Sequence, residues 1–257
     1  MVLSIIKIGG NVIDNPDKLD AFLKQFAEIP SPKILVHGGG KLATKLSAQL
    51  GIETHMVDGR RITDKATLDL VTMVYAGLIN KQIVAKLQAL DCNAIGLSGA
   101  DANIIPAHKR LPTPIDFGFV GDIVPDEINI AAITTLLQSG ITPVFCALTH
   151  DSKGSMLNSN ADSIASALAQ SLSALFEVHL VYCFELPGVM KDIEDSASLI
   201  TDITPIIYNQ LRADGIISKG MIPKIDNAFA AIRKGVKCVI IKSSDNLANN
   251  IGTTIHL

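Results

Sequence analysis

Two copies of one local pattern in the first fifty residues constrain the fold of this chain more than any other feature. Residues 2–8 form an apolar run of strand length that ends at Gly9 and Gly10, and a helix-forming segment follows. Residues 33–37 form a second apolar run, which ends at a triple-glycine turn, 38–40, before another helix-forming segment. A repeated order of strand, glycine turn and helix is typical of parallel sheets with helical connections. The sequence therefore predicts an α/β fold.

The remainder of the chain continues this alternation. Further strands are expected at 94–97, 142–148, 178–183 and 236–242, and helices at 16–28, 41–50, 64–90, 129–138, 163–173 and 221–234, with another from 204. Short antiparallel pieces are expected at 53–63, 104–108 and 117–124, and a terminal strand at 253–257. We expect a mainly parallel twisted sheet with helices on both faces. The polar segment 149–154 suggests two lobes, 1–154 and 155–257.

The composition indicates a globular protein that acts on small molecules. Of the 257 residues, 48% are hydrophobic, and the net charge is −3. No basic run is present, which argues against nucleic acid or an anionic membrane as a partner. Residues 1–8 lack a basic leader region and Lys7 interrupts their apolar run, so we expect a cytoplasmic protein without a membrane span.

The four cysteines do not suggest disulfides or a zinc site. Cys92, Cys146, Cys183 and Cys238 are far apart, lie in apolar surroundings and form no C-x-x-C pair. We expect buried, reduced thiols. The six histidines show no metal-ligand spacing.

Lys7 is the residue in the first strand that needs an explanation. It lies between Ile6 and Ile8, and a lysine is costly in a dry interior. It should therefore face either an anion or water at the carboxyl end of the strand, where open α/β sheets bind ligands. The residues alone leave both interpretations open.

Three further positions allow a functional or a structural interpretation. Arg60 and Arg61 follow the Asp58-Gly59 turn and can bind a carboxylate, although a pair of arginines at such a turn is more often simply solvated. The segment from Asn158 to Asp162 holds more short polar side chains than one helix cap needs. Lys224 lies in the first turn of a predicted helix, where a cation is disfavoured unless an anion is near.

Several familiar catalytic motifs are absent. The chain has no Walker A loop, no G-x-G-x-x-G and no H-E-x-x-H, and residues 96–100 lack the last glycine of a nucleophile elbow. These absences weaken the case for a dinucleotide-dependent oxidoreductase or a serine hydrolase. Glycine turns at strand ends and isolated lysines remain as the candidate functional features.

Taken together, five motifs resemble the amino acid kinase family in their order and spacing. They are Lys7-Ile-Gly-Gly10, His37-Gly-Gly-Gly40, Asp58-Gly-Arg-Arg61-Ile-Thr63, Asn158-Ser-Asn160-Ala-Asp162 and Lys219-Gly-Met-Ile-Pro-Lys224. The resemblance spans the chain and implies the three-layer sandwich of that family. Within the family, the chain is similar to the branch that phosphorylates N-acylated glutamate.

The resemblance also implies residue roles. Lys7 and Lys224 would stabilise the transferring phosphoryl group, and Asp162 would hold both lysines in place. Binding of the acylated amino acid would fall to Gly39, Gly40, Arg61 and Asn158, with Arg61 on the α-carboxylate. The nucleotide contacts would come from Gly9, Gly10, Cys183, Phe184, Gly188, Ile217, Ser218 and Lys219.

The implied reaction is ATP-dependent phosphorylation of the γ-carboxylate of N-acetyl-L-glutamate, a step of arginine biosynthesis, with Mg²⁺ held mainly by the phosphates. This carboxylate is ionised at neutral pH, so the reaction needs no general base. N-succinyl-L-glutamate and acetylated aminoadipate remain alternative substrates. A non-catalytic sensor of a nucleotide or amino acid remains an alternative of another class.

Two departures from the family pattern affect these expectations. Residues 183–188 read Cys-Phe-Glu-Leu-Pro-Gly where the family commonly has a threonine and aspartate pair, which makes the nucleotide contacts there less secure. The first strand begins almost at Met1, without the N-terminal helix of ring-forming, arginine-inhibited relatives. We therefore expect a homodimer that arginine does not inhibit.

Overall fold

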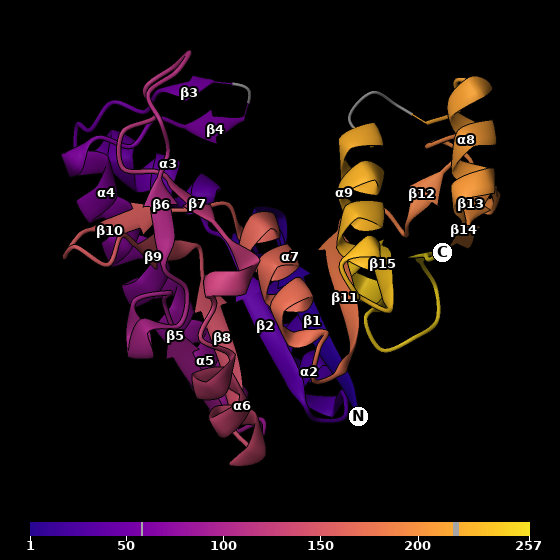
Figure 1. Ribbon diagram of the computed structural model, residues 1–257, viewed down its shortest axis with the longest axis horizontal. Coiled ribbons are helices and arrows are strands. Elements are labelled where there is room, and N and C mark those ends of the chain that lie inside the picture. The colour runs from indigo at the N-terminus through magenta and orange to yellow at the C-terminus, as the bar shows by residue number, and fades with distance from the viewer. Residues whose placement is uncertain (58, 218–220) are drawn as a thin grey trace.

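An eight-stranded sheet forms the centre of the computed structural model, which describes residues 1–57, 59–217 and 221–257. Its strand order is β14-β16-β15-β11-β1-β2-β8-β5, and every neighbouring pair is parallel except β15 with β16 (Figure 1). The strands are β1 (Val2–Ile8), β2 (Lys33–His37), β5 (Ala94–Leu97), β8 (Thr142–Cys146), β11 (Glu177–Phe184), β14 (Asp202–Ile203), β15 (Cys238–Ser243) and β16 (Thr253–Ile255). This sheet confirms the predicted fold class.

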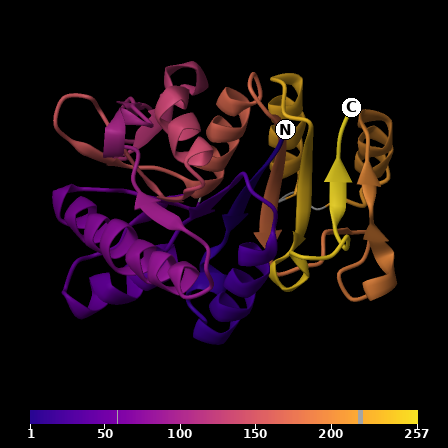
Figure 2. The same cartoon turned by 90° about the horizontal axis from the view of Figure 1, so that it is seen from below.

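Helices cover both faces of the sheet (Figure 2). On one face lie α6 (Ile130–Gln138), α7 (Ala161–Leu172) and α9 (Ile222–Arg233), and on the other α2 (Pro16–Glu28) and α5 (Asn80–Gln88). The remaining α-helices of the described residues are α1 (Gly10–Ile13), α3 (Gly40–Gln49), α4 (Lys65–Thr72) and α8 (Pro205–Ala213). The two covered faces explain why the central strands are almost entirely apolar.

Small antiparallel pairs extend from the sheet. They are β3 (Met56–Val57) with β4 (Arg60–Arg61), β6 (Ala107–Lys109) with β7 (Gly121–Ile123), β9 (Leu148–His150) with β10 (Met156–Asn158), and β12 (Val189–Met190) with β13 (Leu199–Ile200). The first two confirm the antiparallel pieces that the sequence predicted. Asp58, which the predicted turn includes, lies outside the described residues.

Side-chain caps place several helix starts where the sequence predicts them. Asn15 caps α2 by accepting a hydrogen bond from the backbone N–H of Lys18. Asn129 and Thr204 cap α6 and α8 in the same way. A short polar side chain immediately before a helix accepts a hydrogen bond from a backbone N–H group that has no partner within the first turn.

The helix predicted over 64–90 is not a uniform α-helix. Between α4 and α5 the backbone forms a π-helical segment, Met73–Ile79, which the sequence did not predict. The whole run Lys65–Gln88 is long and apolar enough to span a membrane by length and composition alone, another feature not anticipated above. One face of the run, which includes Val74, Tyr75 and Ile79, is buried in the core of the protein.

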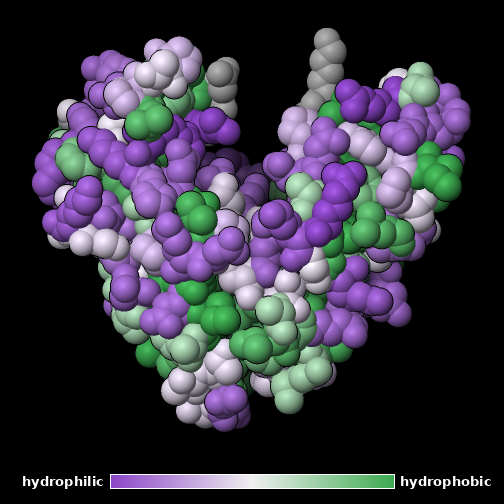
Figure 3. All heavy atoms as spheres, viewed as in Figure 1, coloured by the Kyte–Doolittle hydropathy of each residue, from purple (hydrophilic) through white to green (hydrophobic). Residues whose placement is uncertain are grey.

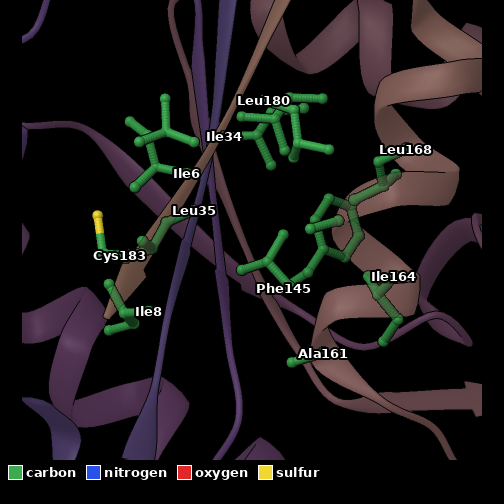
Figure 4. Packing of buried hydrophobic residues seen from close by; sticks show 14 of the residues in the cluster. Ile6, Ile8, Ile34, Leu35, Phe145, Ala161, Ile164, Leu168, Leu180 and Cys183 are labelled. Atoms are coloured by element: carbon green, nitrogen blue, oxygen red, sulfur yellow. The ribbon is translucent and has the colours of Figure 1, made fainter. Parts of the chain in front are cut away.

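The alternation of side chains along the strands forms two separate layers of core. Ile6, Leu35 and Cys183 occupy one face, whereas Ile34 and Leu180 occupy the other, toward α7 (Figure 4). On α7, Ile164 and Leu168 point back at the sheet, and both are fully buried (Figure 4). Three cysteines are buried as predicted, but Cys238 is partly exposed.

The carboxyl ends of the central parallel strands meet at one edge of the sheet. From β1 the chain continues to β2 on one side, whereas from β11 it continues to β15 on the other. Ligands of open α/β sheets bind where the connections diverge in this way. The surface is hollowed between two halves of the molecule, and hydrophilic residues gather along its walls (Figure 3).

Candidate active site

Lys7 is placed at this edge by the pleat of β1. It pairs in register with Tyr182 on β11 and Val36 on β2, so these three side chains share the face that α7 covers. Lys7 is only 8% exposed, yet it lines a cavity of about 770 Å³. The Lys7 side chain is therefore largely buried beside the cavity and is not a solvent-exposed surface lysine.

Asp162 supplies the carboxylate that pairs with Lys7. The Lys7 Nζ and Asp162 Oδ1 atoms are 2.6 Å apart. Asp162 lies in the first turn of α7, and Asn160 caps that turn by accepting hydrogen bonds from the N–H groups of Asp162 and Ser163. The helix dipole favours an anion at this position. The polar segment identified in the sequence thus combines a cap with an ion pair.

Lys224 reaches the same cluster from α9. Its Nζ lies 3.9 Å from the centre of the Phe184 ring, and the Lys7 Nζ lies 5.5 Å from that centre. Burial lowers the pKa of Lys224, an effect that the Asp162 charge partly offsets. Among the described residues, no carboxylate lies within ion-pair distance of the Lys224 ammonium. This group is therefore available to bind an anion.

The second glycine turn approaches the π-helical segment too closely for a larger residue. A Cβ atom on Gly39 would lie 2.3 Å from Ile79 Cδ1 and 3.0 Å from Tyr75 Cδ1. The φ of Gly39 is +157°. Gly40 then begins α3, whose free N–H groups favour an anion. The turn thus brings backbone N–H groups to the cavity that Lys7 lines.

Arg61 lines the same cavity and is held in place by hydrogen bonds. It is 7% exposed, and Nη2 donates hydrogen bonds to the Gly40 carbonyl at 3.0 Å and to Thr44 Oγ1 at 2.8 Å. Nη1 donates to Thr54 Oγ1 at 3.1 Å. The predicted solvated turn applies to Arg60, which is exposed, whereas Arg61 is an ordered cation at the cavity.

Asn158 completes the predicted amino acid site. It is 9% exposed and donates from Nδ2 to Thr63 Oγ1 at 2.9 Å. Its position on β10 places it in the wall of the same cavity. All four residues expected to bind the acylated amino acid therefore line one cavity, together with Lys7 and Asp162.

Tyr75 is a cavity residue that the sequence analysis did not identify. It is 5% exposed, lines the cavity and lies on the π-helical segment. Burial raises the pKa of its hydroxyl, and the neighbouring Arg61 charge opposes that effect. Helical periodicity in a sequence does not reveal a π turn, so no sequence signal pointed to the contact of Tyr75 with the glycine turn.

A second cavity, of about 490 Å³, lies on the other side of the first glycine turn. Of the residues predicted to bind the nucleotide, five line it: Gly9, Gly10, Cys183, Phe184 and Gly188. Lys224 lines it as well, and Gly9, Gly10 and Gly40 border both cavities. Ile217 is buried, whereas the predicted Ser218 and Lys219 lie outside the described residues.

The charges around the first cavity suit an anionic ligand. The side chains of Lys7, Arg60, Arg61 and Arg110 line it, against the carboxylates of Asp122 and Asp162. Asp122 already pairs with Arg110, and Asp162 with Lys7. No group of three His, Cys, Asp or Glu side chains that could hold a metal occurs in the described part of the chain. The cationic side chains at this cavity suit the binding of carboxylate and phosphate groups.

Comparison with known proteins supports this description. The model of the amino acid kinase family matches residues 3–242. The chain is 58% identical to an acetylglutamate kinase of Cytophaga hutchinsonii over 250 residues, 97% of this chain and 94% of that protein. It is 51% identical to one of Phocaeicola vulgatus, covering 98% of each.

A solved structure shows the same fold along the whole chain. The protein smu.665 from Streptococcus mutans UA159 superposes with a TM-score of 0.79 at 28% identity, covering 99% of this chain and 98% of the other. The family model, the full-length relatives and this structure agree with one another. The chain belongs to the amino acid kinase family.

Proposed function

We propose that this protein transfers the γ-phosphoryl group of ATP to the γ-carboxylate of N-acetyl-L-glutamate, as an acetylglutamate kinase of arginine biosynthesis. The observation that carries this proposal is the cluster of Lys7, Asp162 and Lys224 where two cavities meet. Relatives that are 48–58% identical over nearly the full chain are acetylglutamate kinases. The geometry and the relatives point to the same reaction.

The larger cavity is the proposed site for the acylated amino acid. Arg61 would bind the α-carboxylate, since its guanidinium group is fixed at the wall by three hydrogen bonds. Asn158 and the N–H groups of Gly39 and Gly40 would bind the remaining polar atoms. The γ-carboxylate would then lie toward Lys7, at the border with the second cavity.

The transfer itself needs alignment and charge neutralisation. An oxygen of the ionised γ-carboxylate forms a bond to the γ-phosphorus as the bond from phosphorus to the β-bridging oxygen breaks, which leaves ADP and an acyl phosphate. No proton moves in this step. Lys7 and Lys224 would offset the negative charge on the transferring group, and Asp162 would hold Lys7 in place.

The second cavity is the proposed nucleotide site. Gly9 and Gly10 would border the phosphates, and Cys183, Phe184 and Gly188 line the same cavity. Mg²⁺ bound with the nucleotide would supply charge neutralisation at the phosphates. A metal held mainly by those phosphates is part of this proposal. The contacts of Ile217, Ser218 and Lys219 with the nucleotide remain part of this proposal.

We also propose that residues 1–154 contribute mainly the amino acid site and residues 155–257 mainly the nucleotide site. These are divisions of function, because one sheet runs through both parts. We further propose that the protein is cytoplasmic and that it binds neither a membrane nor a nucleic acid.

A homodimer is proposed from the outer face of the run Lys65–Gln88. Met73 and Leu78 are 60% and 42% exposed on a helix whose opposite face is buried in the core. A second copy of the chain would cover these apolar side chains. Light scattering should give the mass of a dimer, and a hexameric mass would contradict this expectation. Arginine should not inhibit the kinase activity, and inhibition by arginine would contradict that expectation as well.

The test of function is ADP release by the purified protein with Mg-ATP and N-acetyl-L-glutamate, with the acyl phosphate trapped as its hydroxamate. N-succinyl-L-glutamate and acetylated aminoadipate are the matched alternative substrates. Faster turnover of the acetyl compound supports the proposal, and preference for another acyl compound would change the substrate but not the reaction. Nucleotide binding without hydroxamate from any of them would indicate a sensor.

A further inference from the structure

Two aromatic side chains end β11 on the face that carries Lys7. Tyr182 and Phe184 are two residues apart, so both point toward α7, and their rings stack with centres 6.2 Å apart. The Tyr182 hydroxyl donates a hydrogen bond to the Asp162 carbonyl at 3.3 Å. The Phe184 ring lies farther out, at the second cavity.

The Phe184 ring contacts both proposed catalytic ammonium groups. The Lys224 Nζ atom lies 3.9 Å from the ring centre and the Lys7 Nζ atom 5.5 Å from it. Both distances fall within the range of about 6 Å over which a cation is attracted to the face of an aromatic ring. The two lysines come from β1 and α9, which lie far apart in the sequence, and they meet at this ring.

This arrangement addresses an electrostatic problem of the free protein. Two ammonium groups share a cluster in which Asp162 pairs with Lys7, so their mutual repulsion is only partly offset. Burial further disfavours the charged form of Lys224. The negative face of an aromatic ring stabilises a cation without adding a charge that would repel the incoming phosphates.

We propose that Phe184 is a positioning residue, whose ring face holds the ammonium groups of Lys7 and Lys224 together for phosphoryl transfer. This inference rests on the proposed function and deepens it. It assigns Phe184 a role beyond lining the nucleotide site. Simple core packing accounts less well for the residue, because Phe184 is only partly buried and lines a cavity.

Stepwise fluorination of the ring tests the inference without removing the side chain. Phe184 is replaced in the full chain by 4-fluoro-, 3,5-difluoro- and 3,4,5-trifluorophenylalanine, which weaken the negative ring face progressively while nearly keeping its shape. We expect kcat to fall with each fluorine, by about threefold to tenfold in total, with KM little changed. A kcat that is independent of fluorine number would overturn the proposal.

Phe229 provides the matched control. Its ring packs on Tyr208 with centres 5.6 Å apart, and it lies on the same helix as Lys224 without contacting the lysines. The same fluorinated residues at position 229 should leave kcat unchanged. An equal decline at both positions would mean that fluorination acts through stability, which would contradict the proposed role of Phe184.

A second readout separates this inference from the proposed function. The pKa of Lys224 can be measured from its ¹³Cε resonance in lysine-labelled protein, assigned with Lys224→Arg. Weakening the ring face should lower that pKa stepwise in the Phe184 series and not in the Phe229 series. If the unmodified protein does not phosphorylate an acylglutamate, the proposed function is wrong. If the pKa of Lys224 shows no trend across the Phe184 series, the proposed role of the Phe184 ring is wrong, whatever the function.

Discussion

Lys7 and Lys242 occupy similar places in the chain and do different things. Each is the next-to-last residue of a strand in the parallel part of the sheet, and each is less than 10% exposed, at 8% and 7%. Lys7 pairs in register with Tyr182, whereas Lys242 pairs with Cys183. A difference of one residue in register sends the two side chains to opposite faces of the sheet.

The environment on each face decides the role of the ammonium group. Lys7 reaches a cavity, an acidic side chain and an aromatic ring. Lys242 donates to the carbonyls of Leu247 at 3.2 Å and Asn249 at 2.6 Å and lines neither of the two cavities described above. Lys33 resembles Lys242, since its three hydrogen bonds go to the carbonyls of Phe26, Ala27 and Ile29. A buried lysine is therefore a candidate catalytic group only when its free donors face a ligand cavity.

The largest effect should follow from Lys7→Ala. We expect kcat to fall by about 10²- to 10³-fold, with KM for both substrates changed far less, because the lost interaction forms mainly in the transition state. Steady-state assays with trapped acyl phosphate measure kcat and KM. Lys224→Ala should show the same loss of kcat. Near-normal kcat in either variant would contradict the distinction between lysines that act in catalysis and lysines that only bind backbone carbonyls.

Lys33→Ala should instead reduce stability. It leaves three carbonyl groups at the C-terminal end of α2 without their partner, so we expect a loss of about 3 to 4 kcal/mol in the free energy of unfolding. Urea denaturation measures this loss. Lys24→Ala, an exposed position on the same helix, is the control and should change stability by less than about 0.5 kcal/mol. The kcat of folded Lys33→Ala protein should stay near normal.

His37 extends the comparison to a buried base that stays neutral. It shares the face of Lys242, and burial lowers its pKa to about 4. Its Nε2 accepts a hydrogen bond from Asn80 and its Nδ1 donates to the Gly38 carbonyl, a pattern that requires the neutral ring.

Because the His37 ring is neutral in the folded protein, the free energy of unfolding should decrease as the pH falls. Unfolded His37 binds a proton below about pH 6.5, whereas the folded form does not until about pH 4. The stability is therefore full above about pH 6.5 and declines as the pH falls toward 4, by up to about 3 kcal/mol. Urea denaturation from pH 7 to 4 should show this decline, and His37→Gln should reduce its slope. An unchanged slope in that variant would place the titration elsewhere.

The smallest effect is expected for Lys242→Met. Its two carbonyl partners lie in a loop near the surface, so we expect a loss of about 1 to 2 kcal/mol in the free energy of unfolding. Thermal denaturation measures it. The kcat should remain within about twofold of normal, and a large loss of kcat would show that register alone does not separate the two lysines.

Much of the architecture could be predicted from local patterns in the sequence. The apolar runs before Gly9 and Gly38 indicated β1 and β2, and Asn129 and Thr204 marked the starts of helices, because a capping side chain acts within its own turn. The motif around Arg61 and the segment from Asn158 to Asp162 were also identified as candidate site residues. Their short-range chemistry is visible in the order of the residues.

Only the tertiary structure could decide which side chains meet. The sequence predicted neither the π-helical segment that directs Tyr75 at the glycine turn nor the contact of Phe184 with two lysines from distant elements. The apolar flanks of Lys7 and Lys242 are alike, so only the glycine motif that follows Lys7 separated the two lysines in the sequence. The sequence by itself determined most strands of the central sheet, several helix starts and most candidate residues, because these depend on neighbours along the chain. Register, helix packing and the face of each side chain depend on contacts between distant segments, and the tertiary structure alone decided them.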